Sequence, residues 1–312
     1  MNIPSVPLLL AGVLFTSSSI LFIKGSSVPP ITLAALRLLT AGAILTPLYF
    51  REFRERRDTS RREASRREAP CPAADTPRPS LADIRFSVVP GILLGLHFIT
   101  WIAGARMTPG SNAALIVNMS PLVMPFLALI AFGERITWRE AAGTAISFSG
   151  FIILGARDFS LDRGSFTGDI VCFVSMLLFA LYLLLARKNN KTGSLWLYIV
   201  PLYLIGGFFC LVIALLAETP LPPPTVRDIL LVLGMAVLPT VVGHSIYNAS
   251  MKRLRSQTVT LLTQGEFLFA ALLSYLFFGE VPVPVFYLSA ALVTAGICVI
   301  ILRQPKKGPS AP

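Results

Sequence analysis

Long apolar runs alternate with short polar connections along most of the chain. The runs fall at about 5–24, 29–50, 84–105, 111–132, 139–156, 167–186, 194–216, 227–250, 256–278 and 283–302. A helix needs about 20 mostly apolar residues to cross a bilayer, and most of these runs reach or approach that length. The pattern therefore predicts an all-α membrane protein with ten transmembrane helices.

Lysine and arginine are distributed unequally between the connections. If the ten runs cross the membrane in turn, 21 of the 27 Lys and Arg residues lie on the side of the N-terminus. The four on the opposite side are Arg106, Arg157, Arg163 and Arg227. Lys24 and Arg37 fall within or at the edge of a span. Because connections rich in Lys and Arg stay in the cytoplasm, both termini are predicted to be cytoplasmic.

One connection, at about 51–82, mixes Arg, Glu, Pro and Ser with almost no apolar residues. This composition predicts disorder. The segment could be a tether that also fixes the topology, or it could contact a regulator or anionic lipids. A nucleic-acid arm is disfavoured, because Phe53 is the one aromatic residue among these arginines. Nucleic acid is therefore not an expected partner.

Composition agrees with the apolar pattern. Hydrophobic residues make up 54% of the chain and charged residues 14%, with a mean hydropathy of +0.71, whereas soluble domains carry roughly 25% charged residues. The four cysteines show no CxxC spacing, so neither a zinc site nor a disulfide framework is indicated. No phosphate-binding loop is present either, and no metal or cofactor is expected.

An internal repeat is visible at an offset of 146 residues. Gly133-Glu134 and Gly279-Glu280 each end an apolar run and precede a short final one. Since each half has five runs, an odd number, two halves with a common fold must enter the membrane in opposite directions, as in many secondary transporters. We therefore predict inverted five-helix repeats at 1–156 and 157–303, and a cytoplasmic tail at 304–312.

The same offset pairs polar residues that lie inside the spans. The pairs are Trp101 with Tyr247, Asn118 with Gln264, and Ser120 with Glu266. A polar group that faces lipid unpaired costs several kcal/mol, so these side chains are expected to face inward. Such repeats bind their solute near the midplane, where the halves meet. The pairs are therefore candidates for the wall of a central cavity.

Two helical faces extend this set. His97 lies four residues before Trp101, and His244 is spaced by three and four residues from Tyr247 and Asn248, so each group shares one face. These faces could line the cavity or make ordinary hydrogen bonds between helices. A metal site is disfavoured, because no HExxH motif or ligand cluster accompanies the histidines.

Three charged residues are candidates for a gate or for coupling. Glu266 is an intramembrane carboxylate with no cation within one helical turn, so it is expected to take up a proton, contact a cationic group, or pair with another helix. Arg37 lies about two turns into its helix and could be a gate, a solute contact or a structural partner. Lys24 could share the gate or reach the interface by snorkelling.

The chain resembles the drug/metabolite transporter superfamily, specifically the EamA type with two EamA domains. The resemblance is carried by Pro29-Pro30, the stretch 33–37, the run from Ala113 to Glu134 with Pro121, and the run from Ser256 to Glu280. Glu266 falls where such proteins often carry Glu-Pro, and Phe267 here replaces that proline. The resemblance implies a carrier in the plasma membrane, the inner membrane of a bacterium, often an exporter of amino acids or other small metabolites.

The leading function is secondary-active transport of small metabolites by alternating access. Its expected partners are a small-molecule solute, the lipid bilayer, and a proton or counter-solute, and a homodimer stays open. The alternatives are a channel-like permease and a translocator of lipids or lipid precursors. An intramembrane enzyme is disfavoured, because Glu134 and Glu280 fall on opposite faces of the membrane in this topology and cannot form one acid/base pair.

Overall fold

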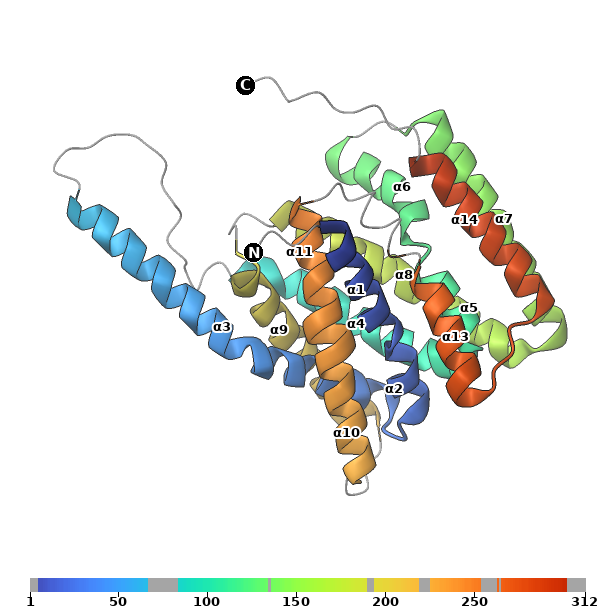
Figure 1. Ribbon diagram of the computed structural model, residues 1–312, viewed down its shortest axis with the longest axis horizontal. Coiled ribbons are helices and arrows are strands. Elements are labelled where there is room, and N and C mark those ends of the chain that lie inside the picture. The colour runs from blue at the N-terminus through green and yellow to red at the C-terminus, as the bar shows by residue number, and fades with distance from the viewer. Residues whose placement is uncertain are drawn as a thin grey trace.

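The computed structural model describes residues 5–66, 84–133, 136–189, 194–218, 225–253, 263 and 265–301. These residues are arranged in helices (Figure 1), with no strand among them. The elements are α1 (Ser5–Ser17), α2 (Ser19–Gly25), α3 (Pro30–Arg66), α4 (Arg85–Met107), α5 (Gly110–Val117), α6 (Ser120–Phe132), α7 (Trp138–Leu161), α8 (Arg163–Asn189), α9 (Trp196–Ala217), α10 (Val226–Met235), the π-helix η3 (Ala236–His244), α11 (Ser245–Arg253), α13 (Glu266–Phe278) and α14 (Pro284–Ile301).

Seven helical segments of the described chain are long and apolar enough to cross a membrane. They are Pro7–Gly25, Pro30–Thr59, Arg85–Met107, Gly110–Ala131, Arg163–Leu185, Trp196–Ala217 and Val226–Ser250. Two further apolar helices, Glu266–Phe278 and Pro284–Gly296, are shorter. The protein is therefore helical and crosses the membrane several times, while the count of ten spans stays a prediction.

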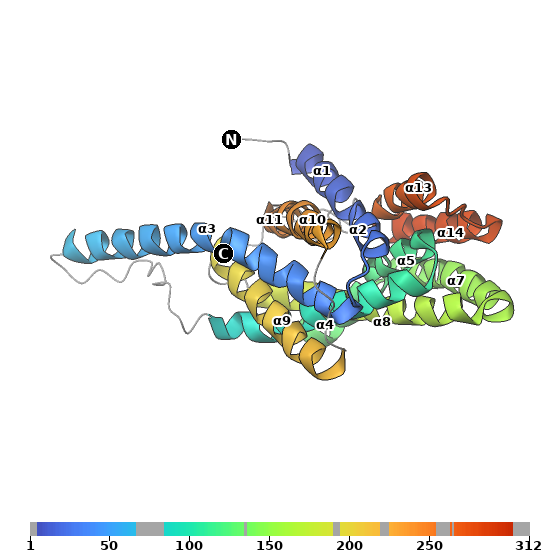
Figure 2. The same cartoon turned by 90° about the horizontal axis from the view of Figure 1, so that it is seen from below.

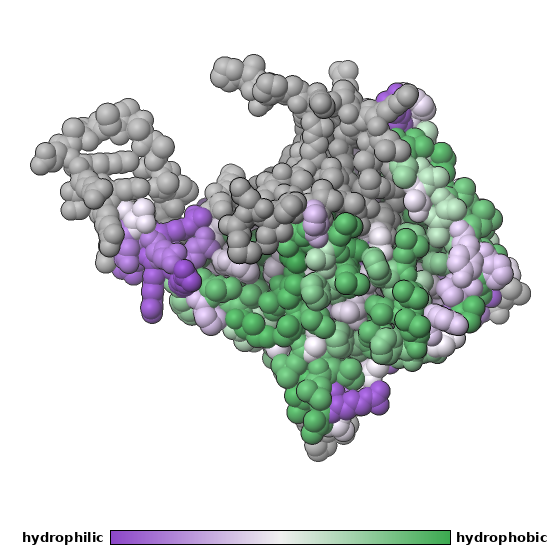
Figure 3. All heavy atoms as spheres, in the orientation of Figure 1, coloured by the Kyte–Doolittle hydropathy of each residue, from purple (hydrophilic) through white to green (hydrophobic). Residues whose placement is uncertain are grey.

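Large apolar side chains cover much of the outer surface. Examples with high exposure are Leu14, Ile130, Leu216, Leu230 and Phe277. Figure 3 shows apolar residues over the face formed by α1, α10 and α13, and hydrophilic residues at the far end of α3. Soluble monomers rarely expose apolar patches of this extent, so this surface is suited to lipid.

Helix α3 does not end where its apolar run ends. It continues to Arg66 and projects beyond the packed helices (Figure 2), so the prediction of disorder is wrong for residues 51–66. Arg and Glu are good helix formers, and ion pairs four residues apart support the extension. Arg51 pairs with Glu55 at 2.8 Å and Arg56 with Glu52 at 3.3 Å. The remainder of the predicted loop lies outside the described residues.

The centre of the molecule is built from four long helices that pack in pairs. Helix α4 lies along both α8 and α9, and α3 lies along α9. At one side α7 and α14 form a separate pair, visible in Figures 1 and 2. Helix α1 packs on η3, and α5 packs on α13 and α8. Elements from both predicted halves therefore meet in the core.

Several spans are interrupted close to the core. Ser18 separates α1 from α2, and Asn118 with Met119 separates α5 from α6. Pro239 lies inside the π-helix η3, and Pro121 is among the first residues of α6. Proline removes a backbone donor and loosens a helix, and irregular backbone at membrane depth is tolerated where it lines a protein cavity.

The 146-residue offset also relates two helices of the structure. Helices α6 and α13 each contain 13 residues with bounds that differ by that offset. Each ends at a glycine in the left-handed region, with φ of 67° at Gly133 and 68° at Gly279. A left-handed glycine is a common helix terminator, because it lacks the Cβ that makes this conformation unfavourable.

Packing of α4 on α8 depends on a close approach at Gly104. A Cβ placed there would lie 2.6 Å from the Cys172 Sγ and 3.0 Å from the Gly168 carbonyl oxygen. We expect Gly104→Val to destabilise the folded protein by about 1–3 kcal/mol, because overpacking forces the helices apart. Thermal unfolding in detergent measures this effect. Gly155→Ala is the control, since the nearest atom to its Cβ is 3.8 Å away, and an equal loss in both variants contradicts the prediction.

Candidate functional site

A small buried cavity lies among helices from both ends of the chain. Its lining residues are Thr16, Ser19, Arg37, His97, Phe98, Trp101, Val117, Asn118, Phe179, His244, Tyr247 and Glu266. Its volume of about 30 Å³ suffices for one or two water molecules. We call it the central chamber. Ligand pockets usually measure roughly 300–1,000 Å³, so the chamber holds too little space for a solute.

Arg37 of α3 is one of the two charged side chains in the lining. It is 1% exposed, and its Nε donates to the Thr240 Oγ1 at 2.6 Å while Nη1 donates to the Ser19 Oγ at 3.2 Å. The guanidinium carbon lies 3.8 Å from the centroid of the Phe98 ring, which is a cation–π contact. Arg37 is thus held by groups from α2, α4 and η3.

Glu266, the first residue of α13, is the second charged group. The Tyr247 hydroxyl donates to its Oε2 at 3.4 Å and lies 2.6 Å from the Thr16 Oγ1. Among the described residues, no Lys or Arg nitrogen forms an ion pair with its carboxylate. The chamber therefore contains a buried cation and a half-buried carboxylate that are not joined directly.

Both histidines line the chamber within an aromatic cluster. The His97 Nδ1 lies 3.0 Å from the Ser175 carbonyl oxygen and 2.8 Å from its Oγ. The His244 ring lies 5.4 Å from the Phe98 ring and 6.2 Å from the Phe179 ring, measured between centroids. Within the described part of the chain, no group of three or more His, Cys, Asp or Glu side chains could hold a metal ion.

The remaining predicted site residues differ in whether they line the chamber. Trp101 and Asn118 line the chamber, and the Asn118 Nδ2 also donates to the Ala114 carbonyl oxygen at 2.9 Å. Asn248 is not in the lining; its Oδ1 accepts from the Tyr182 hydroxyl at 3.1 Å and its Nδ2 donates to the His244 carbonyl oxygen. It therefore joins helices. Gln264 lies outside the described residues.

Lys24 lies outside the lining, at the end of α2. Its ammonium forms an ion pair with Glu280 and donates to the Thr108 carbonyl oxygen at 3.2 Å. The Glu280 Oε2 in turn accepts from the Gly110 amide at 2.8 Å. We call Lys24, Glu280, Thr108 and Gly110 the Lys24 cluster. It joins the ends of α2, α4 and α13 to the start of α5.

Sequence reasoning missed three apolar residues of the chamber lining. Phe98, Val117 and Phe179 line it but lie inside apolar runs, where nothing separates a cavity wall from a packed core. Thr16 and Ser19 belong to a small hydroxylated patch that is visible in the sequence, although such patches also serve close helix packing. Thr240 is identified only by its bond to Arg37.

Comparisons with known proteins agree on one family. The model described as "EamA-like transporter family" matches residues 3–156 and 166–302. An uncharacterized transporter of Archaeoglobus fulgidus is 28% identical over 214 residues, covering 66% of this chain and 75% of that protein. A probable terminal-alkyne amino-acid exporter of Streptantibioticus cattleyicolor is 25% identical over 214 residues, covering 64% of this chain and 67% of that protein.

A solved crystal structure has a similar fold. It superposes with a TM-score of 0.65 at 17% identity, covering 96% of this chain and 97% of the other chain. Likeness at this identity concerns the fold alone.

Proposed function

The chain belongs to the EamA-like transporter family, and from this premise we propose that it moves amino acids or similar small zwitterions across the membrane by secondary-active alternating access. The family and the similar proteins are transporters and not enzymes. One of these relatives is named as an amino-acid exporter, which favours export of this class of solute.

One observation carries the substrate class: Arg37 and Glu266 line the same chamber. Arginine binds a carboxylate through two parallel hydrogen bonds, and a carboxylate is a suitable partner for an ammonium group. A solute with both groups would satisfy both side chains. We propose that His97, Trp101, Asn118, His244 and Tyr247 complete the site, with Asn248 at its margin. Gln264, which lies outside the described residues, stays a predicted member of the site.

Coupling of solute movement to a proton or a counter-solute at the same site follows from the charge of Glu266. A carboxylate without an ion-pair partner in this environment is costly, so a proton or the cationic group of the solute should occupy it in turn. Such exclusive occupancy links movement of the solute to a proton or to a counter-solute. Arg37 and Glu266 are then the coupling residues, and Lys24 belongs to a gate.

Alternating access is supported by the small chamber and by the pattern of packing. The chamber must open to admit a solute, because its volume of about 30 Å³ is far below that of ordinary ligand sites. We propose inverted repeats at 1–156 and 157–303, followed by a tail at 304–312. In this arrangement α1 corresponds to α8, α3 to α9, α4 to η3, and α7 to α14. Exchanging the two halves therefore turns the α4–α8 contact into the contact of η3 with α1, and leaves the α3–α9 and α7–α14 contacts unchanged.

Orientation and setting are further parts of the proposal. With both termini in the cytoplasm, the Lys24 cluster lies at the outer end of the molecule. The expected location is the inner membrane of a bacterium, and a homodimer is compatible with the broad apolar surface.

Counterflow in liposomes tests the proposal. We expect purified protein to accumulate a radiolabelled amino-acid mixture only in vesicles preloaded with unlabelled amino acids, because a carrier exchanges solutes one for one through a closed intermediate. Sugars and nucleosides serve as control solutes. Counterflow restricted to those controls would overturn the substrate class. Unitary conductance steps in a planar bilayer, or scrambling of labelled lipid without amino-acid counterflow, would replace the carrier by a channel or a lipid translocator.

A further inference from the structure

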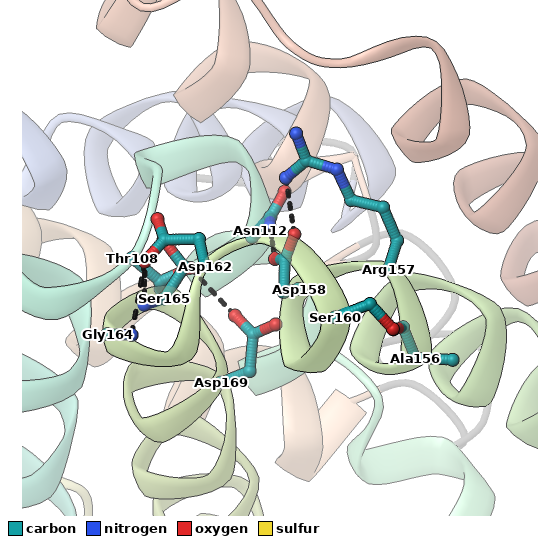
Figure 4. Close-up of polar contacts among 10 residues, drawn as sticks. All are labelled: Thr108, Asn112, Ala156, Arg157, Asp158, Ser160, Asp162, Gly164, Ser165 and Asp169. Carbon is teal, nitrogen blue, oxygen red and sulfur yellow. Dashed lines mark hydrogen bonds and ion pairs between the residues drawn. The ribbon is translucent and has the colours of Figure 1, made fainter.

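Two buried carboxyl groups lie together where α7 ends and α8 begins (Figure 4). Asp158 belongs to α7 and Asp169 to α8, and both are 0% exposed. Figure 4 shows the two carboxyl groups side by side. They lie apart from the central chamber, whose lining includes neither residue.

The donors around this pair are distributed unevenly. Asp158 accepts from the Asn112 Nδ2 at 2.9 Å through Oδ2 and from the Arg157 guanidinium at 2.5 Å through Oδ1. Asp169 accepts from the Thr108 hydroxyl at 2.7 Å through Oδ1. Its Oδ2 is buried and has no hydrogen-bond partner within the described structure. A buried polar atom without a partner is costly, so this oxygen is expected to have a partner that the other described side chains do not provide.

The charged groups nearby do not supply a hydrogen-bond partner for the Asp169 Oδ2. Arg157 is the single cation bonded to the pair within the described residues, and Lys24 is engaged by Glu280. Asp162 adds a negative charge from the connection between α7 and α8, and Cys172 lies one turn beyond Asp169 on α8. Arg106 donates to the Ile23 and Ser26 carbonyl oxygens. Of the two buried carboxyl groups, only Asp158 therefore has a bonded cation among the described residues.

We propose that Asp158 and Asp169 share one proton and form a second proton site of the transporter, next to the outer gate. Two carboxyl groups side by side in a buried site cannot both ionise readily. Asp158 accepts two strong donors and is the carboxylate of the pair. Asp169 carries the proton on Oδ2 and donates it to Asp158, which satisfies the unpartnered atom.

Thr108 connects this pair to the Lys24 cluster. Its hydroxyl donates to Asp169, while its carbonyl oxygen accepts from the Lys24 ammonium. When the proton leaves Asp169 for water, two adjacent carboxylates remain and repel each other across the α7–α8 connection. Any shift of α8 relative to Thr108 then loosens the cluster that joins α2, α5 and α13. Proton release is thereby coupled to opening of the outer gate.

Infrared spectroscopy of the purified protein tests the proton site without any solute. In a Glu266→Gln background, we expect a band from a protonated carboxylic acid that disappears as the pH rises. Asp169→Asn and Asp158→Asn should each remove it. Asp162→Asn should retain it, because hydrogen bonds from Ser165 and Gly164 lower the pKa of Asp162, so this control group stays ionised as the pH rises. A band unchanged in both pair variants would overturn the proposal.

The coupling role rests on the proposed function and needs a transport readout. We expect the ratio of pH-gradient-driven accumulation to counterflow, measured with a radiolabelled amino-acid mixture, to fall by about tenfold or more in Asp169→Asn. Asp162→Asn should keep the wild-type ratio. An unchanged ratio in Asp169→Asn overturns the coupling role. Absence of counterflow in the wild type instead overturns the proposed function and leaves the infrared result standing.

Discussion

Replacing Arg37 with glutamine is expected to raise the amino-acid concentration that half-saturates counterflow by about a hundredfold, while the protein stays folded. A hydrogen bond to a charged group contributes about 1.5–3 kcal/mol, and a tenfold change in affinity corresponds to about 1.4 kcal/mol. Loss of a two-point contact with the solute carboxylate therefore gives roughly this factor. Glutamine can still donate to Thr240 or Ser19, which limits the damage to the fold.

The comparison with a second buried arginine separates binding from folding. Arg106 is partly buried and donates to two backbone carbonyl oxygens, but it does not line the chamber. Arg106→Gln should reduce thermal stability at least as much as Arg37→Gln and leave half-saturation close to wild type. Arg37→Lys should recover part of the affinity, because the charge remains while the planar two-point contact is lost. Equal half-saturation in Arg37→Gln and wild type would remove Arg37 from the site.

Because polar residues are rare in the spans, much of the chamber lining could be predicted from the sequence. Polar side chains inside a membrane avoid lipid, so Trp101, Tyr247 and Glu266 could be expected near one another. The structure places them in one lining, together with Arg37. Their roles in transport stay predictions. For Asn248 the structure shows the second alternative left open for its helical face, a hydrogen bond between helices, because its Oδ1 accepts from the Tyr182 hydroxyl.

Apolar and charged segments each contain a feature that their composition alone does not predict. Phe98 stacks on Arg37, yet an aromatic residue inside an apolar run is indistinguishable from a core residue by pattern. The helical extension of α3 was not predicted, because a composition without apolar residues predicts disorder. Local ion pairs and helix propensity make this segment helical instead. The Asp158–Asp169 pair needs two helices to meet, and no spacing within the sequence encodes that meeting.

Reversing the charge of Lys24 is expected to hold the outer gate open. In the structure Lys24 pairs with Glu280 and donates to Thr108, so Lys24→Glu would place two carboxylates against each other. A carrier that cannot close one gate cannot complete its cycle, and we expect counterflow to fall by about tenfold or more. We also expect a cysteine introduced by Ser19→Cys in the chamber wall to react faster with a membrane-impermeant thiol reagent added outside.

A charge swap distinguishes the gate from a simple loss of stability. Lys24→Glu combined with Glu280→Lys restores opposite charges and should recover a large part of the counterflow, because the interaction belongs to the pair and not to either residue. Arg163→Glu makes the same change of charge at an exposed position at the start of α8 and should leave both transport and labelling near wild type. If the swapped protein stays as inactive as Lys24→Glu, and Ser19→Cys reacts no faster in either variant, the ion pair joins helices without gating the chamber.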